Sequence, residues 1–390
     1  MILHSVKDKR LTGSNTVILR SINDSYALWF ANSKSFVLLQ EPAFEVYRLF
    51  SEGNPILKIK EICQYKFGHL EADIPRFVDE IIRYLRYFNN PKNAPMVSVA
   101  DQSSIVPPCN DFYSSVNYQF GKTKLMIRYQ HEELKFAVHP LISHLEVSGE
   151  PVHENILECF EQEELFILKC NCELISAFDP KDFEFYKGAI SQQIYSLIYG
   201  RGFNDWMMIL HASGVVANNQ AVVFSAAAGS GKSTISALLK AQGYQYLSDD
   251  FIAADEQGHV YPFPAAISVK SGSVKTLEEF YPELQSMLAE EAFTGKLVRY
   301  IPVNNITDES EQGYPVKAFV FVNYSQSEPF ALEPVETKEA LQLLLKETWV
   351  KPTAENVNCF FNWLQQTSFY RLRYSSTQEA IEVVEKLVCS

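Results

Sequence analysis

The sequence predicts an α/β protein in three parts. Three observations support this class: an apolar run, a loop of small residues and a helical repeat follow one another over 220–243; three short apolar runs precede three helical stretches over 14–88; and residues 110–200 alternate aromatic with polar positions. The chain has 390 residues, of which 47% are hydrophobic, so it is long enough for two or three cores.

The first part, residues 1–92, has a βββααα order. Apolar runs at 16–19, 26–30 and 36–39 are separated by INDS and ANSKS, which are rich in turn-forming residues. Helices are expected from Glu41-Pro42, over 56–65, and from Asp73-Ile74-Pro75, since proline is favoured at the first helical position. This order predicts a winged-helix unit.

A linker and a small unit come next. Residues 93–109 lie in a stretch rich in Pro, Asn and Ser, which predicts a linker. The alternation over 110–200 predicts a small mixed α/β unit that ends in a helix over 183–199. The remaining residues, 201–390, form the third predicted domain.

The third domain is organised around the stretch QAVVFSAAAGSGKSTISALLK, which begins at Gln220. A β-branched run, a small-residue loop, Lys232-Ser233 and a helical repeat ending near Gly243 form the order that a phosphate-binding loop requires. Backbone N–H groups and the helix N-terminus would face phosphate oxygens, the lysine would reach the β- and γ-phosphates, and the serine would ligate Mg²⁺. The stretch predicts ATP and Mg²⁺ as cofactors.

One position departs from the usual G-x-x-x-x-G-K-[ST] pattern. Ala226 stands where glycine is usual, and alanine adopts a positive φ less readily than glycine. The residues expected to bind the nucleotide are Ala226, Ala227, Ala228, Gly229, Ser230, Gly231, Lys232, Ser233 and Thr234.

Two adjacent carboxylates, Asp249 and Asp250, follow the next apolar segment. Neighbouring carboxylates repel each other, so a pair at a strand end beside such a loop is best explained by Mg²⁺ and by a hydroxyl that needs a base. A solvated turn is the alternative interpretation. Upstream lies His211, and a lone histidine is more often structural than catalytic.

The order His211, GSGKST at 229–234 and Asp249-Asp250 resembles the catalytic domain of the HPr kinase/phosphorylase family and its HPr-kinase-related relatives. The resemblance implies a kinase that phosphorylates a serine hydroxyl. It also implies that Ser233 and Asp250 hold Mg²⁺, that Asp249 is the general base and that His211 hydrogen-bonds near Asp249. The family's E-[IV]-R-G-[LM]-G signature is missing, which favours the diverged relatives over the phosphorylase.

Residues 30–53, FANSKSFVLLQEPAFEVYRLFSEG, together with the helices after them resemble the PqqD-like peptide-recognition domain. That resemblance implies that the leader segment of a precursor peptide adds as a strand to the sheet edge. A winged helix that binds DNA, or one that only scaffolds, is the alternative.

Two cations beyond the acids are candidates for stabilising the transferring phosphate: Lys270 and Arg299. For each of them the alternative is an ordinary exposed side chain. Residues 271–300 between them predict an acidic helical region that could cover the site.

The charge argues against nucleic acid as a partner. Residues 1–92 hold 13 Lys+Arg and 10 Asp+Glu, a net +3, so the rest of the chain carries −13 − 3 = −16. No run of 18 apolar residues and no signal peptide is present, so we expect no membrane partner and a cytoplasmic protein. The seven scattered cysteines fit reduced thiols, and a homo-oligomer remains open.

The sequence thus predicts an ATP-dependent kinase that phosphorylates a hydroxyl of a ribosomally made precursor peptide held by residues 1–92. Two alternatives stay open. One is a non-catalytic, nucleotide-dependent peptide-binding protein, and the other is a kinase for a small molecule.

Overall fold

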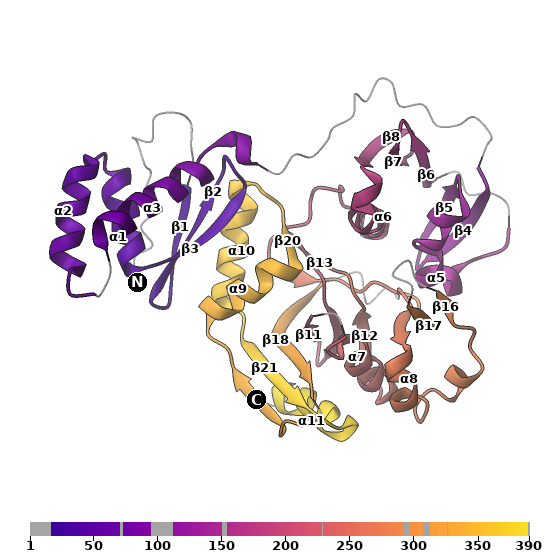
Figure 1. The fold of residues 1–390 in the computed structure, drawn as a ribbon. Helices are drawn as coiled ribbons and strands as arrows, with labels where there is room; N and C mark the ends of the chain where they lie inside the picture. The colour runs from indigo at the N-terminus through magenta and orange to yellow at the C-terminus, as the bar shows by residue number, and fades with distance from the viewer. Residues whose placement is uncertain are drawn as a thin grey trace. The chain divides into compact units, whose positions relative to one another are not determined.

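The computed structural model describes residues 17–70, 73–94, 112–149, 154–227, 229–291, 296–306, 313–325 and 327–388. They form a mixed α/β structure with several sheets, which confirms the predicted class (Figure 1). The chain divides into two compact units. The first comprises the chain up to residue 97 with Glu336–Leu344 and Val350–Gln366, and the second comprises Ser98–Val335, Leu345–Trp349 and Thr367–Ser390.

The first unit contains the expected three strands followed by three helices. They are β1 Val17–Ile22, β2 Ser25–Phe30, β3 Ser35–Gln40, α1 Glu41–Ser51, α2 Ile56–Phe67 and α3 Ile74–Phe88. The strands form an antiparallel sheet in the order β1-β2-β3. Leu28 and Phe30 on one face pack with Tyr47 of α1 and Leu85 of α3, so the helices and this face share a core.

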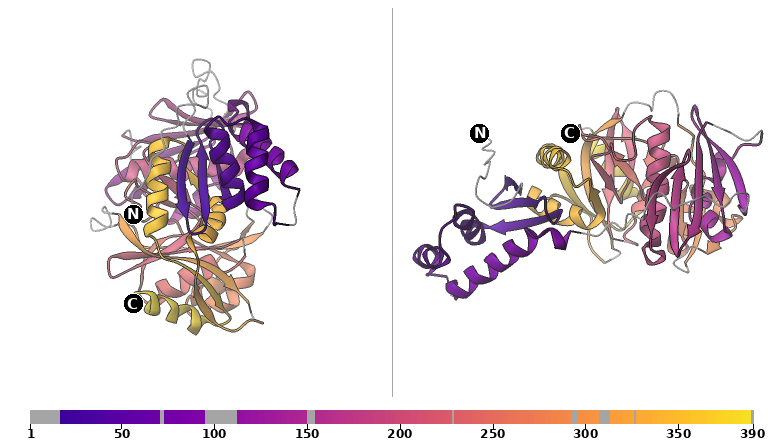
Figure 2. Two further views of the ribbon diagram at one scale, coloured as in Figure 1. Left: turned by 90° about the vertical axis from the view of Figure 1, so that its left-hand side faces the viewer. Right: turned by 90° about the horizontal axis from the view of Figure 1, so that it is seen from above.

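Two helices from far along the chain complete the first unit. They are most of α9, which spans Thr337–Glu347 and belongs to this unit up to Leu344, and α10, Ala354–Gln366. The sequence predicts both in the third domain. Phe36 on the other face of the sheet meets the rings of Phe360 and Phe361 of α10 edge to face, each at 5.8 Å between centroids. Figure 2 shows α10 beside this sheet. Both faces of the sheet are therefore covered within the unit.

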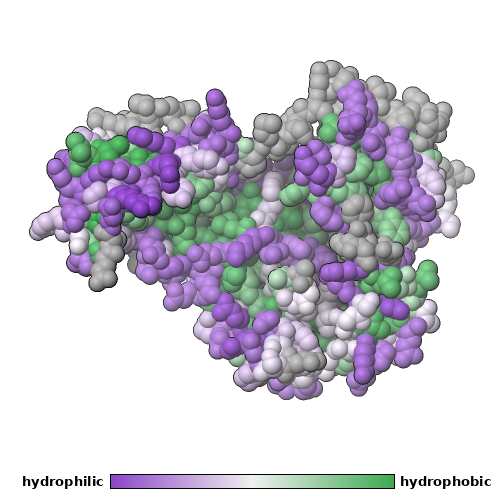
Figure 3. Space-filling model, viewed as in Figure 1, coloured by the Kyte–Doolittle hydropathy of each residue, from purple (hydrophilic) through white to green (hydrophobic). Residues whose placement is uncertain are grey.

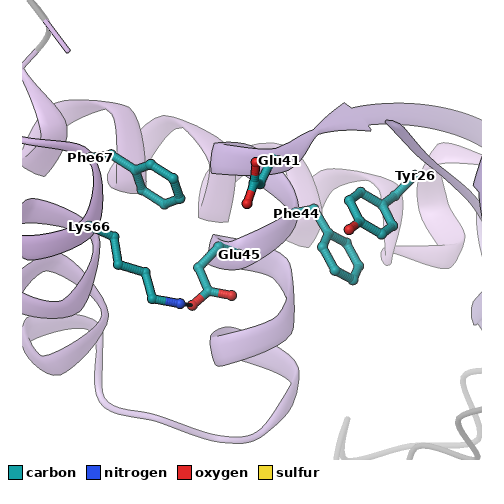
Figure 4. A pocket seen from close by; sticks show the side chains of 6 residues that line it. All are labelled: Tyr26, Glu41, Phe44, Glu45, Lys66 and Phe67. Atoms are coloured by element: carbon teal, nitrogen blue, oxygen red, sulfur yellow. Dashed lines mark hydrogen bonds and ion pairs between the residues drawn. The ribbon is translucent and has the colours of Figure 1, made fainter. Parts of the chain in front are cut away.

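A buried carboxylate joins α1 to α2. Glu45 accepts a hydrogen bond from Arg48 at 2.8 Å. It also accepts one from Lys66, which Figure 4 shows. These two partners, acting against desolvation, lower the pKa of Glu45 to about 2. The pair borders a cavity of about 340 Å³ that is also lined by Tyr26 and Phe44, whose rings stack. Two of the charged groups that line this cavity, Glu45 and Lys66, therefore pair with each other.

The second unit begins with a five-stranded sheet in the order β4-β5-β6-β7-β8. Its elements are β4 Ser114–Phe120, β5 Thr123–Tyr129, α4 Glu132–Phe136, α5 His139–Ile142, β6 Ile156–Gln162, β7 Leu165–Cys170, β8 Glu173–Phe178 and α6 Phe183–Ile198. The helix expected over 183–199 is confirmed. The predicted linker lies mostly outside the described residues.

The larger sheet of the second unit has ten strands among the described residues, in the order β12-β10-β11-β18-β14-β13-β9-β20. Strand β21 also pairs with β18, and β19 pairs with β21. Its strands are β9 Met208–Leu210, β10 Ser213–Ala217, β11 Gln220–Ser225, β12 Gln245–Ser248, β13 Ile252–Ala254, β14 His259–Val260, β18 Tyr314–Tyr324, β19 Ala331–Pro334, β20 Thr348–Val350 and β21 Phe369–Tyr374. Helices α7, Lys232–Ala241, and α11, Thr377–Val388, pack together through Leu238, Val383 and their neighbours. The centre of the sheet, β11-β18-β21, is parallel.

One core joins the small unit to the larger sheet, so residue 200 is not a structural boundary. Tyr186 and Tyr195 of α6 share a hydrophobic cluster with Tyr261 and Phe263. The Tyr195 hydroxyl donates to the Tyr261 carbonyl at 2.8 Å, and the Tyr199 hydroxyl donates to the Pro262 carbonyl at 2.8 Å. Helix α6 therefore holds the segment that follows the two carboxylates.

The region 271–300 is less helical than the sequence predicts. A short helix, α8 Ser271–Leu277, is followed by β16 Glu290–Glu291 and β17 Leu297–Ile301. They form a small antiparallel sheet with β15 Ile267–Lys270 in the order β15-β17-β16. Arg299 thus lies on β17, opposite Val269 of β15. Alternating apolar side chains of these strands bury one face of the small sheet.

Polar residues dominate the face of the molecule seen in Figure 3, with apolar residues in smaller groups. This agrees with the 21% of charged residues in the sequence. Within the described ranges, no helix combines the length and apolar character needed to cross a membrane.

The Glu45 cluster predicts a pH-dependent stability of the first unit. Because the folded-state pKa of Glu45 lies below its ordinary value of 4.5, its stabilisation is complete above that pH and is lost as the pH falls toward 2. We expect E45Q to destabilise α1 by about 1–3 kcal/mol at pH 6 and by less than half as much at pH 3. Hydrogen–deuterium exchange of α1 measures both values.

The matched control is E52Q, since Glu52 pairs with the same Arg48 from an exposed position. An exposed pair contributes about 0–1 kcal/mol, so exchange of α1 should change little. Equal effects of the two variants at pH 6 would contradict the role given to Glu45.

Candidate active site

Sheet direction brings three sequence motifs to one edge. β10 runs antiparallel to both β11 and β12, so its beginning lies where those two strands end. His211 precedes β10, the glycine-rich loop follows β11, and Asp249-Asp250 follows β12. The three motifs therefore meet, although they are separated along the chain.

The glycine-rich loop has its left-handed residues at glycines. Gly229 has a φ of 88° and Gly231 a φ of 99°, whereas neither Ala226 nor Ala227 has a positive φ. The alanine at 226 therefore strains no backbone, and its side chain is buried in the core below α7. Ala228 lies outside the described residues.

Two tyrosines hold the loop from the neighbouring strand ends. The Tyr324 N–H donates to the Ser230 carbonyl at 3.2 Å. The Tyr374 hydroxyl lies 3.4 Å from the Gly231 carbonyl, and a Cβ on Gly231 would come within 2.4 Å of that hydroxyl. Only glycine fits this position, for both its φ and its contact with Tyr374.

Lys232, the first residue of α7, is 6% exposed. Its ammonium has no hydrogen-bond partner among the described residues, and its nearest ionic partner is the Asp250 Oδ1 at 3.7 Å. Burying an ammonium without hydrogen bonds is unfavourable. A buried cation next to loop amides and a helix N-terminus is suited to hold an anion such as phosphate.

Asp249 is 5% exposed and fixed through both of its oxygens. Its Oδ1 accepts from the Ser233 hydroxyl at 3.0 Å, and its Oδ2 accepts from the Ser268 N–H of β15 at 3.1 Å. Desolvation, reinforced by the charge of Asp250, raises the pKa of Asp249 to about 7. This carboxylate is therefore bound to the serine at the start of α7.

Asp250 points in another direction because its backbone is left-handed, with a φ of 64°. Its Oδ1 lies 3.3 Å from the Nε2 of His211. Desolvation favours the neutral carboxyl, but the His211 hydrogen bond and the charge of Lys232 outweigh it and lower the pKa of Asp250. The expected contacts are thus exchanged: His211 meets Asp250 instead of Asp249, and Ser233 meets Asp249 instead of Asp250.

Glu347, at the end of α9, is not among the residues that the sequence predicts for the site. Its Oε2 is 3.2 Å from the Nδ1 of His211, and its carbonyl accepts from the His211 N–H at 2.8 Å. No local motif marks this residue. Only the position of β20 at the edge of the larger sheet brings it to His211.

The small sheet separates the two candidate cations. Residues opposite each other in antiparallel strands share a face of the sheet, and faces alternate along each strand. Tyr300 is opposite Ser268 and Lys270 is two residues further on, so these side chains share one face. Arg299 is opposite Val269, on the other face. Both Lys270 and Tyr300 interact electrostatically with Asp250. Arg299 instead donates to the Met287 carbonyl at 3.2 Å. The structure therefore places Lys270 near the two acids and Arg299 away from them. It also brings Tyr300, a residue that the sequence does not predict for the site, to Asp250.

The oxygen atoms of this edge fit Mg²⁺. Ser233 offers a hydroxyl, and Asp249 and Asp250 offer carboxylates, which are oxygen ligands of the kind that Mg²⁺ prefers. A protein-bound Mg²⁺ usually takes its other ligands from water and from substrate phosphates. Within the described residues no group of three or more His, Cys, Asp and Glu forms a site that the protein alone could fill. The donor set therefore suits an ion that arrives with a nucleotide.

No protein-family model matches the chain, and no curated protein sequence is significantly similar to it.

The packing of Gly231 predicts a larger effect for its replacement than backbone strain alone. Gly243, at the other end of α7, also has a positive φ of 91° but nothing within 4 Å of a Cβ. G243A should lower stability by about 1 kcal/mol, and G231A by about 2–4 kcal/mol, because G231A also displaces Tyr374. Urea unfolding monitored by hydrogen exchange of α7 compares them, and equal effects would contradict the Tyr374 contact.

Proposed function

We propose that the chain is an ATP-dependent kinase that phosphorylates a hydroxyl, most simply that of a serine, on a precursor peptide captured by its first unit. The observation that carries this proposal is the buried ammonium of Lys232, which has no hydrogen-bond partner in the described part of the chain and lies beside a pair of carboxylates. A triphosphate supplies the acceptors that this ammonium lacks.

The hydrogen bond between Ser233 and Asp249 indicates which carboxylate belongs with Mg²⁺. We assign Ser233 and Asp249 to the metal, in place of the Ser233 and Asp250 pair that the sequence suggested. When bound, Mg²⁺ neutralises charge on the phosphate oxygens. Lys232 and the loop amides orient the triphosphate.

Asp250 is then the acid left for the acceptor. The acceptor oxygen attacks the γ-phosphorus, the bond from phosphorus to the bridging oxygen of the β-phosphate breaks, and the hydroxyl proton passes to Asp250. A carboxylate of lowered pKa suits a loose transition state, in which the proton moves late. Lys270, which interacts with Asp250, adds positive charge where the phosphoryl group transfers.

The first unit supports peptide capture through one strand. Among the described residues, β3 pairs only with β2, so its outer edge is free to accept another strand. At the opposite edge, Gln365 of α10 donates to the Ser21 carbonyl of β1 at 3.3 Å. A leader segment that adds to this sheet therefore has β3 as its place.

Incubation with labelled ATP, Mg²⁺ and a library of synthetic serine-bearing peptides tests the proposal, with free serine and glycerol as small-molecule acceptors. We expect label on peptides. Label only on small molecules would leave a small-molecule kinase, and ATP binding without any transfer would leave a nucleotide-dependent binding protein.

Variants of the two acids test the exchanged assignment. D250N should lower kcat by about 10²- to 10⁴-fold while ATP binding is kept, because it removes the base. D249N should instead raise the Mg²⁺ concentration needed for ATP binding. The opposite result would restore Asp249 as the base.

Two lysine variants test whether the buried ammonium of Lys232 binds ATP, with an exposed lysine as the control. K232A should abolish ATP binding measured by calorimetry, since the buried ammonium is the main counter-charge for the triphosphate. K275A, which removes an exposed lysine on α8, should bind ATP as the native protein does. Unchanged binding in K232A would refute the nucleotide site.

A further inference from the structure

The orientation of the His211 ring is not fixed by burial. Its side chain is 50% exposed, and the ring reaches Asp250 through Nε2 alone. A half-exposed histidine can turn about its side-chain bonds, so a second contact is needed to keep Nε2 directed at Asp250. Glu347 makes that contact on the opposite nitrogen, Nδ1, at 3.2 Å.

We infer that Glu347 is a positioning residue, which holds the His211 ring so that Nε2 faces Asp250. A carboxylate can only accept, so Nδ1 donates to it. The backbone supports the same register, since the His211 N–H donates to the Glu347 carbonyl at 2.8 Å. This inference rests on the proposed kinase activity, in which Asp250 takes the hydroxyl proton.

The larger sheet keeps Glu347 close to His211. Glu347 comes directly before β20, and His211 comes directly after β9. Because β20 pairs with β9, the two residues lie side by side at the edge of the sheet.

Truncation of Glu347 tests the positioning role. We expect E347A to lower kcat for transfer to the labelled peptides by about 5- to 30-fold with the KM for ATP unchanged, the loss of one charge-assisted hydrogen bond. E347Q keeps an oxygen that accepts from Nδ1, so it should restore kcat to within about threefold of the native value. E355A, an exposed glutamate of α10, is the matched control and should leave kcat unchanged.

Two outcomes would overturn the inference. One is an unchanged kcat in E347A, and the other is a loss in E347Q as large as in E347A, which would point to charge in place of orientation.

NMR of the His211 ring separates a failure of the positioning role from a failure of the proposed function. If the native protein transfers no phosphate, the kinase proposal fails. The ring resonances still decide the positioning role, because they should shift in E347A, remain in E347Q, and exclude the inference if E347A leaves them in place.

Discussion

The burial of one ammonium group is the constraint on which the second unit depends. Lys232, the first residue of α7, is almost fully buried and has no hydrogen-bond partner among the residues that the structure describes; its ammonium lies 3.7 Å from Asp250. An isolated buried charge is strongly unfavourable, so the fold must surround it with groups that accept it or leave room for an anion. The left-handed glycines, the start of the helix and the carboxylate pair all satisfy this single requirement.

The position of the carboxylates depends on residues far outside the loop. The Asp249 Oδ2 is fixed by the Ser268 N–H, and the strand that carries Ser268 begins where a segment held by α6 ends. The small β unit therefore supports the site through the tyrosines of α6, and it shares one hydrophobic core with the larger sheet. A change in that core would be felt at Asp249, because packed interiors transmit displacement.

Adjacent carboxylates acquire different properties from a single left-handed residue. The φ of 64° at Asp250 sends its side chain to His211, while Asp249 stays under β15. Desolvation raises the pKa of Asp249 to about 7, whereas at Asp250 the His211 hydrogen bond and the charge of Lys232 outweigh desolvation and lower the pKa. Two titratable groups with opposite environments are a recurrent means of dividing acid–base and ion-binding roles. Here the difference between the two pKa values follows from backbone geometry.

The sequence by itself determined the α/β class, the three N-terminal strands and helices, the glycine-rich loop and the presence of a carboxylate pair, because each depends on local periodicity or on a short motif. The tertiary structure decided which acid meets His211, and it placed Lys270 and Tyr300 at the site and Arg299 away from it. It also joined α10 and most of α9 to the first unit, and it brought Glu347 to His211. Strand register and chain crossings set these contacts, and neither leaves a local signal in the sequence.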